Sequence, residues 1–183
     1  MLRLFFGVPV PAAARLRLEA ALRRLEGEGW RSSAAGGLHL TLRFLGDTPA
    51  ALVPALTAAL REAARSELPF DVRAGRLIGL PDRHRARVAA AAVDTGAAPL
   101  ARLSEALTCA LLPLGIEPEA RPFRPHLTLA RSGGAPRTVP EDDGVDATFP
   151  VERLVLWESI LGRPHARYRA VAEASLGPRP ARD

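Results

Sequence analysis

The tetrapeptide His-Leu-Thr-Leu occurs twice in this chain, at residues 39–42 and 126–129, and contains half of its four histidines. In a β-strand, successive side chains point to opposite faces, so His and Thr would share one face and the two leucines the other. Imidazole and hydroxyl groups are costly to bury without hydrogen-bond partners. The pattern therefore favours two strands whose polar faces line a wet cleft.

Two imidazoles and two hydroxyls on one cleft suit phosphodiester hydrolysis without a metal. Histidine titrates near neutrality, so a neutral His can take a proton from water while a protonated His gives one to the leaving oxygen. Threonine hydroxyls can bind the non-bridging phosphate oxygens. We predict His39 and His126 as catalytic residues, and Thr41 and Thr128 as phosphate-binding residues. The near-symmetric arrangement leaves open which histidine is the acid.

Two other interpretations of the motifs remain. In a metal site, zinc takes at least three protein ligands, whereas the two motifs supply two histidines and no further His, Cys or carboxylate. The histidines could instead be core residues with satisfied hydrogen bonds. We expect neither a metal nor a cofactor.

Several residues near the motifs are candidates for substrate contact. Alternation places Arg43 on the His39 face, where it would contact the phosphate, or else end the strand as a solvated charge. Arg131 has the wrong parity for the His126 face and would reach the phosphate only if the strand twisted or bulged near its end. Phe123 would stack on a base or pack in the core. Phe44 is expected in the core.

The composition limits the possible chemistry. All 25 basic residues are arginine, which excludes a lysine nucleophile, a lysyl-adenylate and a Walker-type phosphate loop. The net charge of +5 and a pI near 11.0 favour an anionic partner, although the abundance of Ala, Arg, Gly and Pro could reflect genomic base composition instead. The single cysteine, Cys109, is expected to be a small buried thiol.

A shift of 87 residues superimposes the two motifs and also the elements that precede them. Strand 2–10 and helix 12–26 in the first half correspond to strand 88–94 and helix 100–112 in the second. We infer an internal duplication and an α+β fold with two pseudo-symmetric lobes. Their two antiparallel sheets would face a central cleft, with the helices on the outside.

Beyond the motifs the two halves differ. The first continues with a helix at 50–66 and a strand at 70–80, and the second with a Pro/Gly/Asp-rich loop at 133–147 and strands at 151–159 and 168–175. Residues 1–176 are expected to form one domain, followed by a disordered tail at 177–183. The apolar start is short and interrupted by proline, and no apolar run reaches membrane-spanning length, so we expect a cytoplasmic monomer without a membrane partner.

The paired H-x-T-x motifs resemble those of the 2H phosphoesterase superfamily. The stretches RLFFGVPVP, LHLTLRFLGD, RPFRPHLTLAR and LVLWES, followed by Tyr168, resemble the bacterial and archaeal RNA 2′,3′-cyclic phosphodiesterases, also called 2′–5′ RNA ligases. The resemblance runs from Leu2 to Leu176.

The resemblance implies metal-independent hydrolysis of RNA 2′,3′-cyclic phosphate ends to 2′-phosphates, with reverse 2′–5′ ligation, and RNA ends or cyclic nucleotides as partners. It also implies that His126 activates water, that His39 protonates the leaving 3′-oxygen, and that Arg131 contacts the phosphate. The alternatives are a non-catalytic module that binds RNA ends, and the same chemistry on another cyclic phosphodiester. The sequence does not specify the natural RNA or the preferred base.

Overall fold

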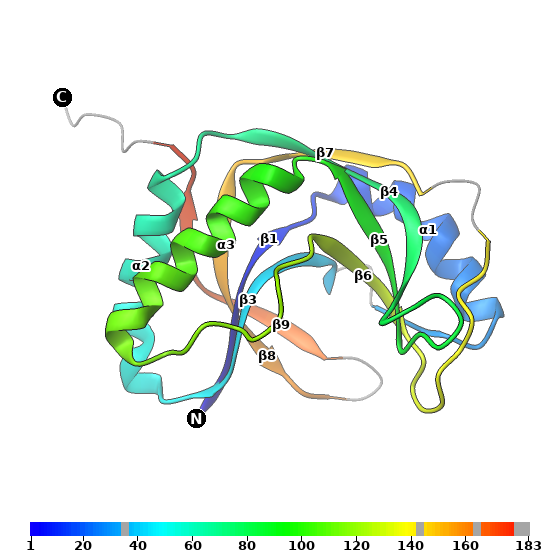
Figure 1. The fold of residues 1–183 in the computed structure, drawn as a ribbon, viewed down its shortest axis with the longest axis horizontal. Coiled ribbons are helices and arrows are strands. Elements are labelled where there is room, and N and C mark those ends of the chain that lie inside the picture. The colour runs from blue at the N-terminus through cyan, green and yellow to red at the C-terminus, as the bar shows by residue number, and fades with distance from the viewer. Residues whose placement is uncertain (34–36, 142–144, 163–165, 178–183) are drawn as a thin grey trace.

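The computed structural model describes residues 1–33, 37–141, 145–162 and 166–177. Over these residues the chain alternates helices and antiparallel strands, which confirms the predicted α+β class (Figure 1). The helices are α1 (Ala12–Gly27), α2 (Val53–Arg65) and α3 (Ala97–Leu111). The strands are β1 (Leu2–Pro9), β2 (Arg31–Ser32), β3 (His39–Thr48), β4 (Phe70–Leu80), β5 (Val88–Thr95), β6 (His126–Arg131), β7 (Ala147–Val151), β8 (Arg153–Ile160) and β9 (Arg167–Ser175).

The strands form one continuous sheet instead of the two separate sheets that we predicted. Its order is β7-β4-β5-β6-β3-β1-β8-β9, with the short β2 paired to β6, and every pairing is antiparallel. The two HLTL strands, β3 and β6, are neighbours at its centre and pair through Leu40 and Leu127 alone. This junction joins the group of β7, β4, β5, β6 and β2 to the group of β3, β1, β8 and β9. A single residue pair therefore connects into one sheet the strands that the repeat predicted would form two.

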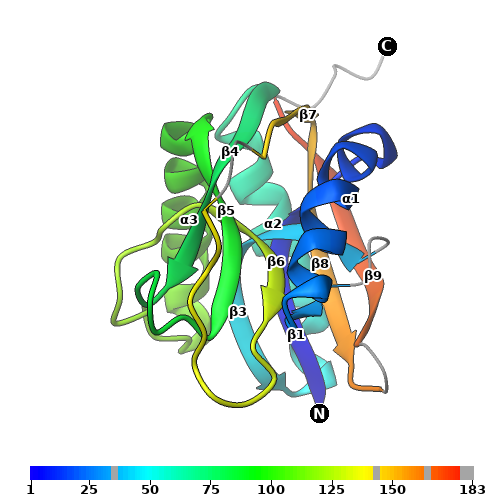
Figure 2. The same cartoon turned by 90° about the vertical axis from the view of Figure 1, so that its right-hand side faces the viewer.

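The helices cover the sheet in two places. Helices α2 and α3 pack against each other and against β3, β8 and β9, while α1 lies against β2, β6 and β7 (Figures 1 and 2). In α3 the fully buried residues Leu100, Leu103 and Leu107 follow the three-to-four-residue spacing of an amphipathic helix. The buried stripes of the helices and the leucines of the HLTL strands form one core.

Helix α3 with the turn that follows it, Ala97–Leu114, is long and apolar enough to span a membrane by length and composition, contrary to the expectation from the sequence. Its leucine stripe is buried against α2 and β3, so we assign it as a core helix of this domain. Cys109 lies off that stripe and is exposed, so the prediction of a buried thiol is wrong.

Most predicted elements are present within a few residues of their expected bounds. The predicted strand at 151–159 is instead divided at Glu152 into β7 and β8, which pair with β4 and β1 respectively. Strand β7 begins where the predicted loop ends, and the two-residue β2 was not predicted. Residues 178–183 of the predicted tail lie outside the described residues, whereas Gly177 donates a backbone hydrogen bond to Glu67, 2.7 Å away.

Candidate active site between the two HLTL strands

The antiparallel pairing of β3 and β6 places the four motif side chains on one face of the sheet. Directly opposite residues of an antiparallel pair point to the same face. Leu40 and Leu127 are such a pair, and both are buried in the core. The residues on either side of them are half-buried and point to the opposite face, away from the core: His39, Thr41, His126 and Thr128. In this register each histidine lies across from the threonine of the other motif.

Each of the two histidines is held by an equivalent hydrogen bond. The Nδ1 atom of His39 lies 2.7 Å from the carbonyl oxygen of Gly37, and that of His126 lies 2.7 Å from the carbonyl oxygen of Arg124. A carbonyl oxygen only accepts, so Nδ1 carries the proton in each ring. Nε2 is therefore the atom that can exchange a proton with substrate in both histidines.

The surroundings of His39 are strongly aromatic. Its ring centroid lies 4.6 Å from that of Phe5 and 4.8 Å from that of Tyr168, and Phe5 also stacks on Trp157 at 6.5 Å. Burial lowers the pKa of His39 below its ordinary value of 6.5; the bond to Gly37 raises it and the charge of Arg131 lowers it further. The free protein therefore favours the neutral imidazole at this position.

A β-bulge follows the threonine in both motifs. At this point each strand has one extra residue relative to its neighbour, Leu42 in β3 opposite β1 and Leu129 in β6 opposite β5; farther along, β3 has a second one, Leu45. An extra residue reverses the alternation of side chains beyond it. The first six residues of both strands accordingly share one burial pattern, in which the fourth and fifth residues are both buried.

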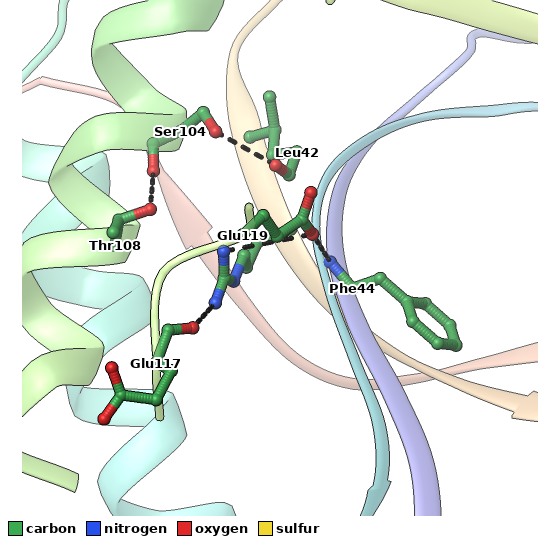
Figure 3. Close-up of polar contacts among 7 residues, drawn as sticks. Leu42, Phe44, Ser104, Thr108, Glu117 and Glu119 are labelled. Carbon is green, nitrogen blue, oxygen red and sulfur yellow. Dashed lines mark hydrogen bonds and ion pairs between the residues drawn. The ribbon is translucent and has the colours of Figure 1, made fainter. Parts of the chain in front are cut away.

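The bulge turns Arg43 into the core side of the sheet, so the prediction that Arg43 shares the His39 face is wrong. Its side chain is 5% exposed, donates to the backbone carbonyl of Glu117 and lies 3.9 Å from the carboxylate of Glu119. Figure 3 shows Glu117 and Glu119 beside this strand, with the Glu119 carboxylate directed toward Phe44. Arg43 thus ties the segment that follows α3 to β3.

Helix α3 also anchors the bulge itself. The buried hydroxyl of Ser104 donates to the carbonyl oxygen of Leu42 at 3.0 Å, and the carboxylate of Glu119 accepts from the backbone N–H of Phe44 at 3.3 Å (Figure 3). The two bonds satisfy backbone groups on either side of Arg43.

In each strand the sixth residue, which follows the buried fourth and fifth residues, points again to the polar face. In β3 this residue is Phe44, which is 42% exposed, so its predicted core position is wrong; the guanidinium of Arg3 lies 4.8 Å from the centre of its ring. In β6 it is Arg131, which is exposed and whose charge acts on His39. We expected Arg131 to reach the histidine face only if β6 twisted or bulged near its end, and the bulge at Leu129 is such a deviation.

Two cavities adjoin the histidines, one on each side of the central strand pair. A cavity of about 360 Å³ beside His39 is lined by Trp157 and Tyr168 from β8 and β9. A cavity of about 480 Å³ beside His126 is lined by residues of β4, β5 and the segment that carries Phe123. Each cavity is lined in part by the histidine and the two residues that precede it in the sequence. These are residues 37–39 in one half and 124–126 in the other.

Comparison with known proteins agrees with this geometry. The model of the 2′-5′ RNA ligase superfamily matches residues 9–163. The chain belongs to this superfamily. It is 34% identical over 183 residues to the RNA 2′,3′-cyclic phosphodiesterase of Thermus thermophilus (96% of this chain, 90% of the relative), and 31% identical to that of Escherichia coli (95% and 96%).

Two solved structures share the superfamily fold. A crystal structure of a Thermus thermophilus protein matches with a TM-score of 0.82 at 31% identity, covering 96% of this chain and 98% of that one. A structure of Escherichia coli LigT complexed with 3′-AMP matches with a TM-score of 0.79 at 27% identity, covering 96% and 98%.

The remaining sequence candidates take varied positions in this superfamily member. Trp30 is buried in the core, and Phe123 both lines the cavity beside His126 and packs partly against the core. Trp157 stacks on Phe5 and also lines the cavity beside His39. His84 lies in an exposed loop, and His165 lies outside the described residues. Among the residues that the structure describes, no three His, Cys, Asp or Glu side chains form a group that could hold a metal ion.

Sequence reasoning missed Phe5, Arg15 and Arg167 as neighbours of the site. Phe5 contacts His39, and the two arginines line the cavity beside it. They come from β1, α1 and β9, and no short motif connects them to the HLTL strands. The signal available was the period of two in β1, which sends Phe5 to the polar face while Leu4 and Phe6 enter the core.

Proposed function

We propose that this protein hydrolyses the 2′,3′-cyclic phosphate at RNA ends to a 2′-phosphate, using His39 and His126 as an acid–base pair without a metal. The observation that carries the proposal is that two histidines with the same Nδ1 anchor share one face with two threonines. The curated relatives that are RNA 2′,3′-cyclic phosphodiesterases support the choice of substrate.

The reaction is a displacement at phosphorus. Water attacks the cyclic phosphate and gives a proton to Nε2 of one histidine. The bond from phosphorus to the ribose 3′-oxygen breaks, and Nε2 of the other histidine donates a proton to that oxygen. Thr41 and Thr128 donate hydrogen bonds to the non-bridging oxygens, and Arg131 balances their charge. The products are a 2′-phosphate and a free 3′-hydroxyl.

The aromatic cavity supports the assignment of His39 as the acid. Trp157 and Tyr168 offer flat apolar surfaces of the kind on which bases stack, so the nucleoside and its 3′-oxygen would lie on the His39 side. The entering water then lies on the His126 side. The lowered pKa of His39 opposes this role in the free protein, but a bound phosphate anion beside Arg131 would favour the protonated ring.

The test is product analysis with a 2′,3′-cyclic mononucleotide in the presence of EDTA. Wild-type protein should release the 2′-phosphate, and His39→Ala and His126→Ala should each lose about 10²-fold or more in turnover. His84→Ala, which changes an exposed loop histidine, is the matched control and should retain full activity. Turnover that EDTA abolishes, or a 3′-phosphate product, would contradict the mechanism.

The principal alternative is a module that binds RNA ends without reacting. A related structure, that of Escherichia coli LigT, is complexed with 3′-AMP, so we extend nucleotide binding to this chain as part of the proposal. Nucleotide binding by the wild type without turnover would favour the module. Faster turnover of a cyclic phosphodiester other than an RNA end would favour a different substrate.

We also infer that the two halves of the chain descend from one duplicated unit that forms the two sides of the cleft. The supporting observations are the shared burial pattern of the HLTL strands, the bulge after each threonine and the common anchor of both histidines. The correspondence extends to the two cavities, each of which is lined by the motif histidine and the two residues before it.

A further inference from the structure

A further cavity adjoins the aromatic cavity beside His39. It measures about 490 Å³ and lies between the end of β1, the start of α1 and the junction of β7 and β8. We refer to it as the outer cavity and to the cavity beside His39 as the inner cavity. Each has the volume of a small-molecule site, which is roughly 300–1,000 Å³. The residues that line both cavities are Pro9, Val10, Arg15 and Trp157.

The outer cavity lies on the face of the sheet that carries the motif residues. Trp157 is directly opposite Phe5 in the pairing of β8 with β1, so the two side chains share a face, and Phe5 contacts His39. Residues an even number apart on a strand also share a face, which places Arg153 of β8 on that of Trp157. Both residues line the outer cavity. The two cavities therefore form one groove that starts at His39 and runs along this face.

Arg15 lies where the two cavities meet. Its side chain is half-buried, and within the described residues no hydrogen bond or ion pair engages its guanidinium. It belongs to the first turn of α1, which has no side-chain cap and no acidic residue, so the positive end of the helix adds to its charge. A half-buried cation without a partner is costly, and a phosphate held between the cavities would pair with it.

The rest of the outer cavity is mostly apolar. Its other charged residues are Arg153 and Glu152, which have opposite signs, and Arg153 already forms an ion pair with Glu173 at 3.3 Å. The remaining surface includes the Trp157 indole and the rings of Pro9, Pro11 and Pro150. Flat apolar surfaces of this kind suit a nucleobase and its sugar better than a phosphate.

Trp157 provides a second group without a partner in this groove. Its indole Nε1 atom is buried and has no hydrogen-bond partner among the described residues. A buried indole N–H usually has a partner. An acceptor on a ligand beside this wall of the two cavities would satisfy it.

The chemistry of a ribonucleotide fixes the direction in which a strand would follow the groove. In the last nucleoside the cyclic phosphate bridges the 2′- and 3′-oxygens, whereas the 5′-oxygen extends from the opposite side of the sugar. With the cyclic phosphate at the motif residues and the base in the inner cavity, the 5′-oxygen points away from His39. The outer cavity continues the inner one away from His39, with Arg15 between them.

We propose that the groove binds the last two nucleotides of one RNA strand, with Arg15 on the phosphodiester that links them. The last nucleoside occupies the inner cavity and the preceding one occupies the outer cavity. This inference rests on the proposed function and specifies the direction and the minimum length of its preferred substrate.

The contact of Arg15 with phosphate is tested by a ratio. The kcat/KM for a nucleoside 2′,3′-cyclic phosphate that carries a 5′-phosphate is divided by that for the same compound with a 5′-hydroxyl. We expect a ratio of about ten or more for wild type, because hydrogen bonds between charged groups are strong. The ratio should fall close to one in Arg15→Ala and stay well above one in Arg15→Lys, which keeps the charge.

The control is Arg17→Ala, which removes an exposed arginine from the same helix and should keep the wild-type ratio. A general loss of folded protein lowers both rates equally and cancels in the ratio. A wild-type ratio near one, or an unchanged ratio in Arg15→Ala, would overturn the inference.

The outer cavity is tested by filling it. Ala12 and Ala13 are both exposed at the start of α1, and of the two only Ala12 lines the cavity. The substrates are a dinucleotide that ends in a cyclic phosphate and the 5′-phosphorylated cyclic mononucleotide. Ala12→Trp should lose about fivefold or more in kcat/KM on the dinucleotide relative to the mononucleotide, whereas Ala13→Trp should match wild type.

Two other outcomes separate this inference from the proposed function. If wild-type protein used the dinucleotide no better than the 5′-phosphorylated mononucleotide, no second nucleotide would bind in the groove, and the inference would be overturned while hydrolysis stood. If wild-type protein hydrolysed none of the cyclic phosphates, the proposed function itself would fail, and the inference with it.

Discussion

The two motif histidines differ in their surroundings and not in how they are held. The same 2.7 Å bond from Nδ1 to a carbonyl two residues earlier fixes both rings, so both present Nε2. His39 is also packed against Phe5 and Tyr168 and feels the charge of Arg131. If one ring acts as the acid and the other as the base, the residues around each ring determine which is which.

The effect of Arg131 on His39 can be measured directly. Removing the positive charge in Arg131→Gln should raise the pKa of His39, but not back to 6.5, because burial is the larger cause of its lowering. The measurement is an NMR titration of the imidazole protons, with Arg61→Gln as the control for loss of one arginine charge. An unchanged pKa in Arg131→Gln would mean that Arg131 does not face His39.

At the scale of the elements, the bulges decide which side chains reach the cleft. Without the extra residue at Leu42, Arg43 would face the site and Phe44 the core; with it, the two exchange places. The equivalent bulge at Leu129 brings Arg131 to the site. The bulge at Leu42 thus removes Arg43 from the site, and the bulge at Leu129 adds Arg131 to it.

The central strands also depend on a close approach between β1 and β3. A Cβ atom on Gly7 would lie 2.6 Å from the carbonyl oxygen of Leu40, the residue between His39 and Thr41. Gly7→Ala should therefore lower the free energy of unfolding by about 1–3 kcal/mol and reduce turnover, because the backbone of the motif must move. Urea denaturation and the cyclic-phosphate assay measure the two effects.

The control for this substitution is Gly27→Ala at the end of α1, where a Cβ atom would meet nothing within 4 Å. That change should be neutral or slightly stabilising, because alanine favours helix more than glycine does. If the two alanine variants had equal stability and activity, the close approach of β1 to β3 would not matter to the site.

For the molecule as a whole, the sheet joins an aromatic side and a basic side through one pair of leucines. The aromatic side lines the cavity beside His39, and the basic side lines the cavity beside His126. The two HLTL strands therefore form a near-symmetric centre whose two flanks differ in chemistry.

Burial of His39 also affects the stability of the whole fold. Because its pKa is lowered in the folded protein, the unfolded chain binds a proton there more readily, so the free energy of unfolding decreases as pH falls below 6.5 toward the folded pKa. His39→Gln lacks this titration. The stability of wild type relative to His39→Gln should be constant above about pH 7.5 and should shrink by about pH 5.5.

Chemical denaturation at several pH values measures this difference. His84→Gln, which changes an exposed histidine, serves as the control and should follow the wild-type pH dependence. A difference between wild type and His39→Gln that stays constant over the whole range would show that burial does not perturb His39.

The sequence by itself determined the motif residues, the strand and helix positions near them, and the superfamily. The motif residues and the elements follow from local signals: alternation in HLTL, helical leucine spacing and a repeat of 87 residues. The superfamily came from the resemblance of the paired motifs and the stretches around them to a known family. Strand parity also sent His39, Thr41, His126 and Thr128 to one face, because no bulge precedes them.

Only the tertiary structure decided the rest. Bulge positions depend on pairing with β1 and β5, which are distant in sequence. The faces on which Arg43, Phe44 and Arg131 lie therefore could not be predicted from alternation alone. The single Leu40–Leu127 pair, which makes one sheet instead of two, is likewise a contact between distant strands. The same holds for the aromatic and basic cavities, whose linings come from strands far from the motifs.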